Sequence, residues 1–500
     1  MNQKYGVSRK IASFSQAFGG YILTFLAIVQ GLLLIPLYLS YINVDLYGYW
    51  LTILSVISLL NIVNFGINEV VVPRISRAYA LKDYDEMMSY FVNSLIIYIT
   101  TCVIFFFLCL FASLFLNEIL NIAPQSFFVI KTCFFIATTT SIITVVNQLL
   151  ADFSNATLKP QFQMITRIVS QILGLGVTVF LVINDYGIVS IAIGLLLSEA
   201  LGCLVSGFYV YRKIKVYNKK FQINILKIKE LLSLVPAMFS AILGNKLIDE
   251  SPQLIITNII SAEMTTAYVV TKKVAEIILR LVRTSIISLL PSLSNANAKE
   301  ELWKQQKIVK IILFIGSLFS FVSFSMYIML NKNFVNLWLS QSIALDQAVI
   351  LLIGLSTFVF SMVEIFKYFH FSIGNFEYPS YLALLGGVFS TCFSLIFVSS
   401  LGVLAMPVGC LIVASIILIL SSYNFFKRLE MSISIGSVKR AILFVAFIVL
   451  IGTNVLKFDF ASGWMDFIIT LTFLSLILLG TSVVFYYKQL IKILLLIRGK

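Results

Sequence analysis

Residues 92–116 read VNSLIIYITTCVIFFFLCLFASLFL, a run of 25 residues without a single charged side chain. A helix of about 20 apolar residues spans the hydrocarbon core of a bilayer, so this run predicts a transmembrane helix. The whole chain shares this character, because hydrophobic residues make up 60% and charged residues 12% of its 500 positions. A typical soluble protein has about twice that charged fraction. The sequence therefore predicts an all-α polytopic membrane protein.

Thirteen further segments are apolar and long enough to cross a bilayer. The fourteen predicted transmembrane segments are residues 16–40, 46–68, 92–116, 127–150, 162–183, 188–211, 231–258, 264–290, 308–331, 343–368, 379–400, 402–425, 441–456 and 464–486. The first is too long for the apolar core of a signal peptide, so we expect it to be retained as a helix. The connections between the segments are too short for a soluble domain.

Basic residues gather in the connections that follow every second predicted segment. The clusters are Arg74/Arg77/Lys82, Arg212/Lys213/Lys215/Lys219/Lys220, Lys299/Lys304/Lys307, Lys427/Arg428/Lys439/Arg440 and Lys488/Lys492/Arg498/Lys500. Because Lys and Arg mark cytoplasmic connections, both termini are predicted to be cytoplasmic, and we expect the chain to lie in an inner (cytoplasmic) membrane. An even number of segments is required by this arrangement, and fourteen satisfies it.

The net charge of +14 does not indicate a nucleic-acid partner. The basic residues form short clusters between apolar segments, and no basic soluble module exists to bind nucleic acid. All six cysteines lie in apolar segments without a CxxC pair. Neither a metal site, a cofactor nor a disulfide framework is therefore predicted.

The chain also contains an internal repeat. Residues 181–213 and 396–428 share a turn, a following glycine and a closing basic pair, at an offset of about 215 residues. Six predicted segments separate the copies, which gives both halves the same orientation in the membrane. We therefore expect two pseudo-symmetric six-helix lobes, residues 1–215 and 216–430, and two additional transmembrane helices in residues 431–500.

The seventh and eighth predicted segments hold most of the charge that lies within the membrane. The seventh carries Lys246, Asp249 and Glu250, and the eighth carries Lys272, Lys273, Glu276, Arg280 and Arg283. At roughly 100° per residue, each set falls within an arc of about 100° on its helix. Eight such charges facing lipid would cost about 24 kcal/mol, more than a typical free energy of unfolding. Both faces must therefore meet protein or water.

These eight charges are five cations and three carboxylates, and a surplus of positive charge suits an anionic ligand such as phosphate. The five cations are therefore candidates for binding such a ligand, and the candidate coupling carboxylates are Asp249, Glu250 and Glu276. A structural alternative stays open, because Lys246/Glu250, Lys272/Glu276 and Glu276/Arg280 have the i,i+4 spacing of helical ion pairs. Arg283, Lys273 and Asp249 lack such a partner within their helix, which favours ligand binding.

Weaker polar stripes occur on three other segments. They are Asn61, Asn64 and Asn68 on the second, Gln163, Arg167 and Gln171 on the fifth, and Glu364, Lys367 and His370 on the tenth. Amides within a membrane either join helices or, in a cavity, contact sugars, so Asn61 and Asn64 are candidate cavity residues. Arg167 is another candidate, with extension to the membrane surface as the alternative.

Short motifs along the whole chain resemble those of a known family. They are Asp45–Leu46–Tyr47–Gly48–Tyr49–Trp50, Asn64–Phe65–Gly66–Ile67, Arg74 with Arg77–Ala78, Leu290–Pro291–Ser292–Leu293–Ser294, and the turns at Gly187 and Gly402. By these motifs the chain is similar to the polysaccharide repeat-unit (O-antigen, Wzx-type) flippases of the multidrug/oligosaccharidyl-lipid/polysaccharide (MOP) exporter superfamily. Asn64 departs from the pattern, since relatives often carry an acidic residue there, which argues against proton coupling at this position.

The resemblance implies a two-lobed, V-shaped fold like that of MATE transporters, working by alternating access. It implies that an undecaprenyl-pyrophosphate-linked oligosaccharide moves from the cytoplasmic to the periplasmic leaflet, with a glycan polymerase complex as a partner. A central cationic cavity is a theme of the family. Here it would be lined by Lys246, Lys272, Arg280 and Arg283.

Two other functions compete with this one. A drug or cation antiporter of the same superfamily usually needs a carboxylate in its N-terminal lobe, and the first two segments offer only Glu69, at an edge. A membrane glycan polymerase or ligase would need a large outer loop, whereas the longest outer connections are about a dozen residues. We therefore expect a transporter and not an enzyme.

Overall fold

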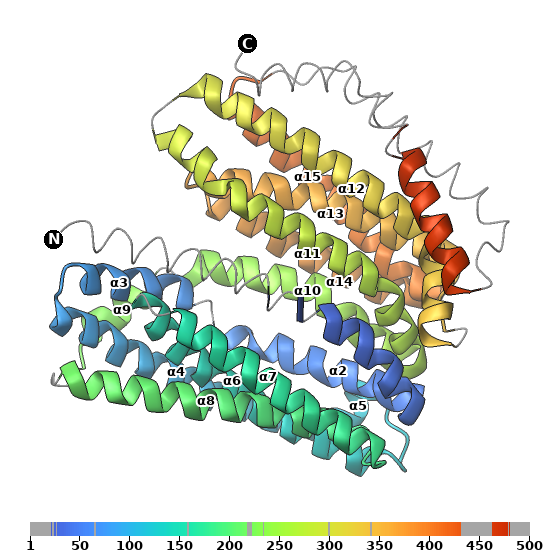
Figure 1. The fold of residues 1–500 in the computed structure, drawn as a ribbon, viewed down its shortest axis with the longest axis horizontal. Helices are drawn as coiled ribbons and strands as arrows, with labels where there is room; N and C mark the ends of the chain where they lie inside the picture. Colours follow the sequence, from blue (N-terminus) through green and yellow to red (C-terminus); the bar gives the residue numbers. More distant parts are fainter. Residues whose placement is uncertain are drawn as a thin grey trace. The chain divides into compact units, whose positions relative to one another are not determined.

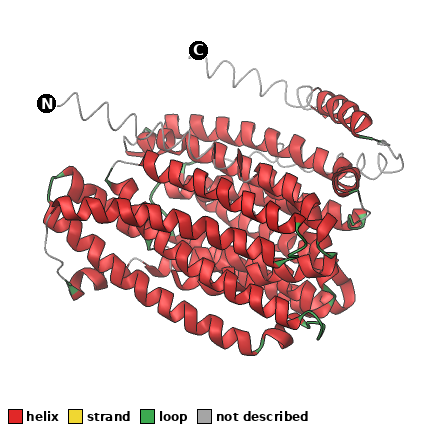
Figure 2. Cartoon of the chain, turned by 60° about the horizontal axis from the view of Figure 1, so that its bottom comes forward, coloured by secondary structure: helices red, strands yellow, loops and turns green. Residues whose placement is uncertain are grey.

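The computed structural model describes residues 28–64, 67–157, 160–217, 223–233, 235–298, 301–340, 343–431 and 463–478, together with residues 22, 25, 26 and 480. Within these ranges every regular element is a helix, as Figure 2 shows. The predicted all-α fold is therefore confirmed. By contact, the chain divides into two compact units, Met1–Thr266 and Ala267–Lys500.

The first unit begins with the helix Ile28–Tyr41. It continues with α2 (Val44–Leu60), η1 (Asn61–Asn64), α3 (Asn68–Ala80), α4 (Tyr84–Leu114), α5 (Leu116–Leu120), α6 (Phe127–Ala156), α7 (Pro160–Ile183), α8 (Val189–Tyr217), α9 (Ile225–Ser233) and α10 (Val235–Ile259). The boundary between the units falls within α11 (Ala262–Ala298). Figure 1 shows these helices in colours that follow the sequence.

The second unit contains α12 (Leu302–Leu339), α13 (Gln347–Ser372), α14 (Glu377–Leu401), η2 (Gly402–Leu404) and α15 (Ala405–Arg428). The helix Trp464–Leu478 packs on α12 through Phe467, which joins a cluster with Met329 and Leu330. The core of this unit forms where α11 to α13 and α15 meet, around the buried side chains Ile286, Val309, Phe369 and Phe425. The two predicted six-helix lobes rest on the sequence repeat and stay a prediction.

Eight segments in the described part of the chain are long and apolar enough to cross a membrane. They are Val44–Val63, Tyr84–Leu114, Phe127–Ala156, Gln161–Ile183, Val189–Lys215, Leu302–Leu339, Gln347–Ser372 and Glu377–Arg428, the last comprising α14 and α15. With 25 and 37 residues, α10 and α11 are also long enough to cross, but they carry the charged residues singled out above. The chain is thus a multi-pass membrane protein.

The count of fourteen transmembrane helices is not confirmed. The predicted segment 441–456 lies outside the described residues, and the segments 16–40 and 464–486 lie there in part. The second predicted segment, 46–68, is not one helix, because α2 ends at Leu60 and a 3-10 turn follows to Asn64. Asn side chains compete with the backbone for hydrogen bonds, which disfavours a continuing α-helix there.

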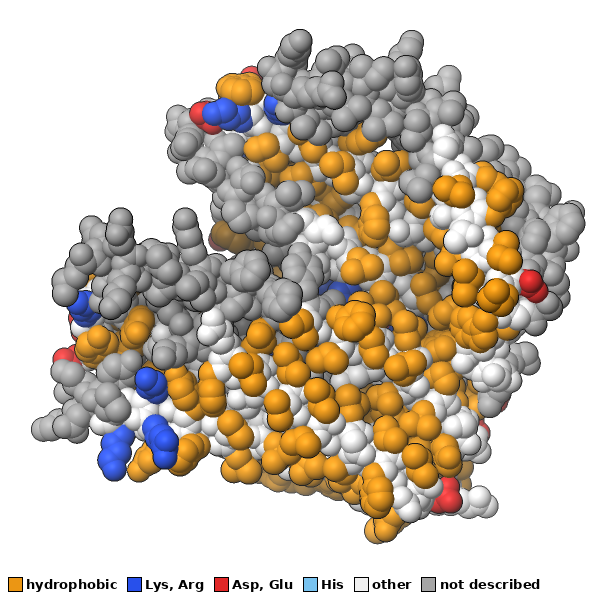
Figure 3. Space-filling view, in the orientation of Figure 1, with side chains coloured by type: hydrophobic (Ala, Val, Ile, Leu, Met, Phe, Trp, Pro, Cys, Tyr) orange, Lys and Arg blue, Asp and Glu red, His pale blue; other side chains and the backbone are white. Residues whose placement is uncertain are grey.

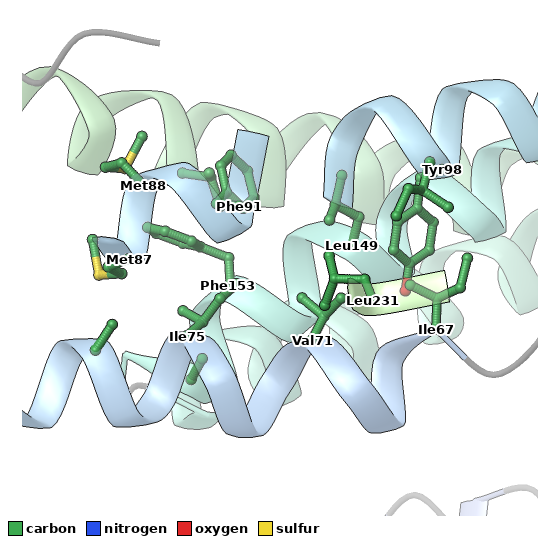
Figure 4. Close-up of a cluster of buried hydrophobic side chains, with 14 of the residues drawn as sticks. Ile67, Val71, Ile75, Met87, Met88, Phe91, Tyr98, Leu149, Phe153 and Leu231 are labelled. Atoms are coloured by element: carbon green, nitrogen blue, oxygen red, sulfur yellow. The ribbon is translucent and has the colours of Figure 1, made fainter. Parts of the chain in front are cut away.

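Two short helices, α3 and α9, lie where the sequence analysis placed connections. Each has an inward apolar side: Ile75 of α3 and Leu231 of α9 join one buried cluster with Phe91 of α4 and Phe153 of α6. Figure 4 shows this cluster, with Phe91 and Phe153 close together in its interior. Helices of 13 and 9 residues are too short to register as transmembrane segments. They become stable through this packing.

The outer face of the first unit is apolar. Ile165, Val169 and Phe180 on α7 and Leu204 and Phe208 on α8 are exposed. Figure 3 shows a largely hydrophobic surface over these helices, with basic side chains where α8 ends. Exposed apolar surface of this extent marks contact with lipid in a membrane protein.

Candidate functional site

The charged residues of α10 contact α2 within the first unit. The carboxylate of Glu250 accepts hydrogen bonds from the hydroxyl groups of Ser55 (2.9 Å) and Ser58 (2.7 Å) on α2. Lys246 lies one turn earlier, with its Nζ 3.8 Å from Oε1 of Glu250, and it also donates to the hydroxyl of Ser58. The i,i+4 spacing of Lys246 and Glu250 thus forms the ion pair that the structural alternative predicts.

The surroundings of this ion pair are polar and tightly packed. The hydroxyl groups of Thr52 and Thr257 share a buried hydrogen bond, and Thr257 shares another with Thr265 at the start of α11. Asp249, the third charged residue of α10, is exposed. Lys246, Asp249 and Glu250 therefore give α10 a net charge of −1. Hydrogen bonds from α2 fix the position of Glu250.

The charged residues of α11 lie in the second unit and have a different balance. Glu276 lies 3.6 Å from Nζ of Lys272 and 3.8 Å from Nζ of Lys273. One carboxylate is thus shared by two ammonium groups. The expectation that Lys273 lacks a partner within its helix is wrong, because the i,i+3 spacing also brings its Nζ within reach of Glu276.

A second carboxylate faces α11 from α13. Glu364 is buried, with 8% of its side chain exposed, and its Oε2 lies 3.1 Å from Nε of Arg283. Its other oxygen accepts a hydrogen bond from Lys367, three residues further on α13. The guanidinium of Arg283 is paired across 81 residues of sequence. Spacing within one helix cannot reveal such a pair.

Arg280 differs from its neighbours on α11. It is the middle residue of the 37-residue helix and its side chain is exposed. Among the described residues it forms no ion pair, so the predicted Glu276/Arg280 pair is not formed. In the part of α11 that lies in the second unit, four cations stand against one carboxylate, Glu276. The pair Glu364/Lys367 adds no net charge. The cationic surplus of the prediction therefore belongs to α11 alone.

The remaining candidate residues are distributed over other helices of the first unit. Asn61 donates a hydrogen bond to the hydroxyl of Ser141 on α6 (3.2 Å), which joins η1 to α6. Asn64 is the last residue of η1. Arg167 is exposed near the start of α7. That all these residues line one cavity with the charges of α10 and α11 stays a prediction.

The sequence analysis overlooked two carboxylates within the membrane-spanning helices of the first unit. Asp152 on α6 is almost fully buried and accepts hydrogen bonds from Tyr98 (2.9 Å) and Gln148 (3.2 Å). Glu199 on α8 accepts one from Asn147 on α6 (3.2 Å). Intramembrane charge alone was a sufficient signal to find both.

Comparison with known proteins now identifies the family. Residues 17–297 match the family described as polysaccharide biosynthesis protein, which is more than half of the chain. A search of curated protein sequences gave no match.

Several solved structures share the fold at low sequence identity. The lipid II flippase MurJ in an inward closed conformation is 16% identical, with a TM-score of 0.69, covering 96% of this chain and 99% of its own. An inward-facing multidrug resistance MATE family transporter of the MOP superfamily is 13% identical, with a TM-score of 0.64, covering 79% and 93%. A MOP superfamily transporter from Pyrococcus furiosus is 14% identical, with a TM-score of 0.51, covering 85% and 94%.

These likenesses confirm the predicted MATE-like fold. By their descriptions, the solved structures are transporters and a flippase. The family match covers the described helices from Ile28–Tyr41 to α11, including both charged helices. The chain therefore belongs to the polysaccharide biosynthesis protein family and has the fold of the MOP superfamily transporters.

Proposed function

We propose that the protein is a flippase that moves undecaprenyl-pyrophosphate-linked oligosaccharide repeat units from the cytoplasmic to the periplasmic leaflet of the bacterial inner membrane. Both termini are cytoplasmic in this proposal, and two six-helix lobes, residues 1–215 and 216–430, alternate access to the substrate. A glycan polymerase complex would receive the translocated unit. Membership of a polysaccharide biosynthesis family and a transporter fold support the proposal.

The observation that carries the proposal is the uncompensated charge on α11. Arg280 is exposed at the midpoint of α11, a helix long enough to cross a membrane, and none of the described carboxylates forms an ion pair with it. An arginine facing lipid at that depth costs about 3 kcal/mol or more, so its guanidinium must meet water or an anion. A pyrophosphate offers oxygens in the geometry that a guanidinium binds in bidentate fashion.

In the proposed mechanism, α11 attracts the anionic headgroup and the lipid tail stays in the bilayer. An inside-negative membrane potential favours outward movement of an anion by about 2.3 kcal/mol per charge for each 100 mV. Asp249, Glu250 and Glu276 are proposed coupling carboxylates. The contacts of Glu250 with Lys246, Ser55 and Ser58 would change if that carboxylate were protonated.

A drug or cation antiporter is the second candidate. The carboxylates of Asp152 and Glu199 favour it, because they supply the intramembrane acids of the first unit that the first two predicted segments lack. An antiporter would confer resistance to cationic drugs, whereas a flippase would not. Drug sensitivity of cells with and without the gene therefore separates the two functions.

The variant Arg280→Ala tests the proposal in cells. We expect it to abolish surface glycan while its abundance in the membrane stays normal, because the side chain carries no described ion pair that stabilises the fold. Arg280→Lys keeps the charge without the bidentate geometry and should retain partial activity. Arg212→Ala, at the end of α8, is the matched control and should behave as the wild type. Normal surface glycan with Arg280→Ala would refute the role of α11.

A further inference from the structure

The segment that joins α8 to α10 is strongly basic. Residues 212–232 contain seven Lys or Arg residues against one Glu. This segment begins at the end of a membrane-spanning helix, since α8 ends at Tyr217, and it includes the short helix α9. It therefore starts at the level of the lipid headgroups.

The inner side of α9 is fixed to the first unit. Leu231 is buried in the cluster of Figure 4, and the carboxylate of Glu230 lies 2.8 Å from Nε of Arg74 on α3. The side chain of Asn93 on α4 accepts a hydrogen bond from the backbone N–H of Asn224 (2.8 Å), just before α9 begins. The helix thus has a defined orientation, with one side toward α3 and α4.

The outer side of α9 is apolar and exposed. Ile225 and Leu226 have 76% and 77% of their surface exposed, and Ile223 and Leu232 are also exposed. Lys229 is exposed between them, while Lys227 lies over the ring of Tyr90, 4.5 Å from its centroid. Exposing four large apolar side chains within ten residues to water is unfavourable, so this side of α9 is expected to contact an apolar phase or a partner.

We propose that α9 lies in the surface of the membrane, with Ile225 and Leu226 inserted among the acyl chains and Lys229 on anionic lipid headgroups. Short helices with apolar and basic residues on their outer side bind the interface in this way, and each basic residue near an anionic surface strengthens the binding. With the proposed cytoplasmic termini, this surface belongs to the inner leaflet. The attachment of α9 to α3 and α4 then anchors the charged end of the first unit to the bilayer.

A soluble protein is the other class of partner that an apolar face fits. The lipid surface is favoured because the charge is almost entirely of one sign over the whole segment 212–232. The apolar residues also follow directly on a membrane-spanning helix. A protein partner would require neither feature.

Depth-dependent quenching of a fluorophore tests the proposal on the full-length protein. A thiol-reactive probe is attached to the variant Ile225→Cys in nanodiscs of phosphatidylcholine, with and without phosphatidylglycerol. We expect nitroxide lipids to quench the probe severalfold more strongly than they quench one at Asp85→Cys, an exposed position in the first turn of α4. The unsubstituted chain is labelled in parallel, because its cysteines are free.

Two further variants separate the apolar and the basic contributions. Leu226→Gln should weaken quenching at position 225 severalfold, and its exposed position leaves the fold intact. Lys229→Gln should weaken the effect of phosphatidylglycerol. Equal quenching at positions 225 and 85 would overturn membrane insertion, and quenching unaffected by phosphatidylglycerol or by Lys229→Gln would overturn anionic lipid recognition. Surface glycan is measured separately, so failure of this proposal leaves the flippase function standing.

Discussion

Arg280 and Glu364 are charged side chains in different environments: Glu364 is buried and paired, whereas Arg280 is exposed. Glu364 is buried between Arg283 and Lys367, so its charge serves the packing of α11 on α13. Arg280 is exposed and forms no ion pair with a described residue. A charge that protein contacts already neutralise has little to offer a ligand, whereas an unpaired guanidinium can bind one. The binding role therefore rests on Arg280 more than on the paired cations.

Removal of the Glu364 carboxylate should destabilise the second unit. Glu364→Ala leaves Lys367 partly buried without its counter-charge, and breaking such a buried pair costs about 3 kcal/mol. Glu364→Ala combined with Lys367→Ala should recover part of that loss, because no uncompensated ammonium group then remains. Thermal unfolding in detergent measures both variants.

Glu377→Ala is the control for this prediction. Glu377 is an exposed carboxylate in the first turn of α14, and its removal should change the midpoint of unfolding little. If Glu364→Ala unfolds at the same temperature as Glu377→Ala, the ion pair with Arg283 and Lys367 does not stabilise the unit.

Long apolar helices were predictable from the sequence, and short amphipathic ones were not. The predicted segment 127–150 begins at the first residue of α6 because hydropathy changes there. The segment 92–116 starts eight residues inside α4, whose polar first turn is capped by Asp83 accepting from the N–H of Glu86 (2.9 Å). The helices α3 and α9 were not predicted, because their stability depends on the buried cluster that they share with α4 and α6.

The packing of α2 against the start of α11 depends on the absence of a side chain at Gly48. A Cβ atom at this position would lie 1.9 Å from the carbonyl oxygen of Ala262, which is rigid backbone. Gly48→Ala should therefore destabilise the first unit by about 2 kcal/mol, the cost of overpacking. Gly176→Ala on α7 is the matched control, since a Cβ there meets nothing within 4 Å. Unfolding midpoints that shift equally for both variants would show that this close approach does not contribute to stability.

For the whole molecule, composition and charge distribution were enough to predict the fold class and the charged helices. The i,i+4 spacing also predicted the pairs Lys246/Glu250 and Lys272/Glu276. It could not predict the contact of Arg283 with Glu364, which depends on how α11 and α13 pack. The spacing also could not show that the surplus of positive charge belongs to α11. Nor could it show that Glu250 of α10 accepts hydrogen bonds from Ser55 and Ser58 of α2.

In the proposed function, the anionic glycolipid crosses the protein by binding to the uncompensated positive charge of α11. Reconstitution tests it most directly, with purified protein in liposomes that contain a pyrophosphate-linked oligosaccharide lipid in one leaflet. The appearance of the glycan on the opposite leaflet is followed with a membrane-impermeant lectin or glycosidase. We predict that the wild type and Arg212→Ala translocate the glycolipid rapidly. For Arg280→Ala we predict a translocation rate no higher than that measured in liposomes without protein. Translocation by Arg280→Ala at the wild-type rate would contradict the claim.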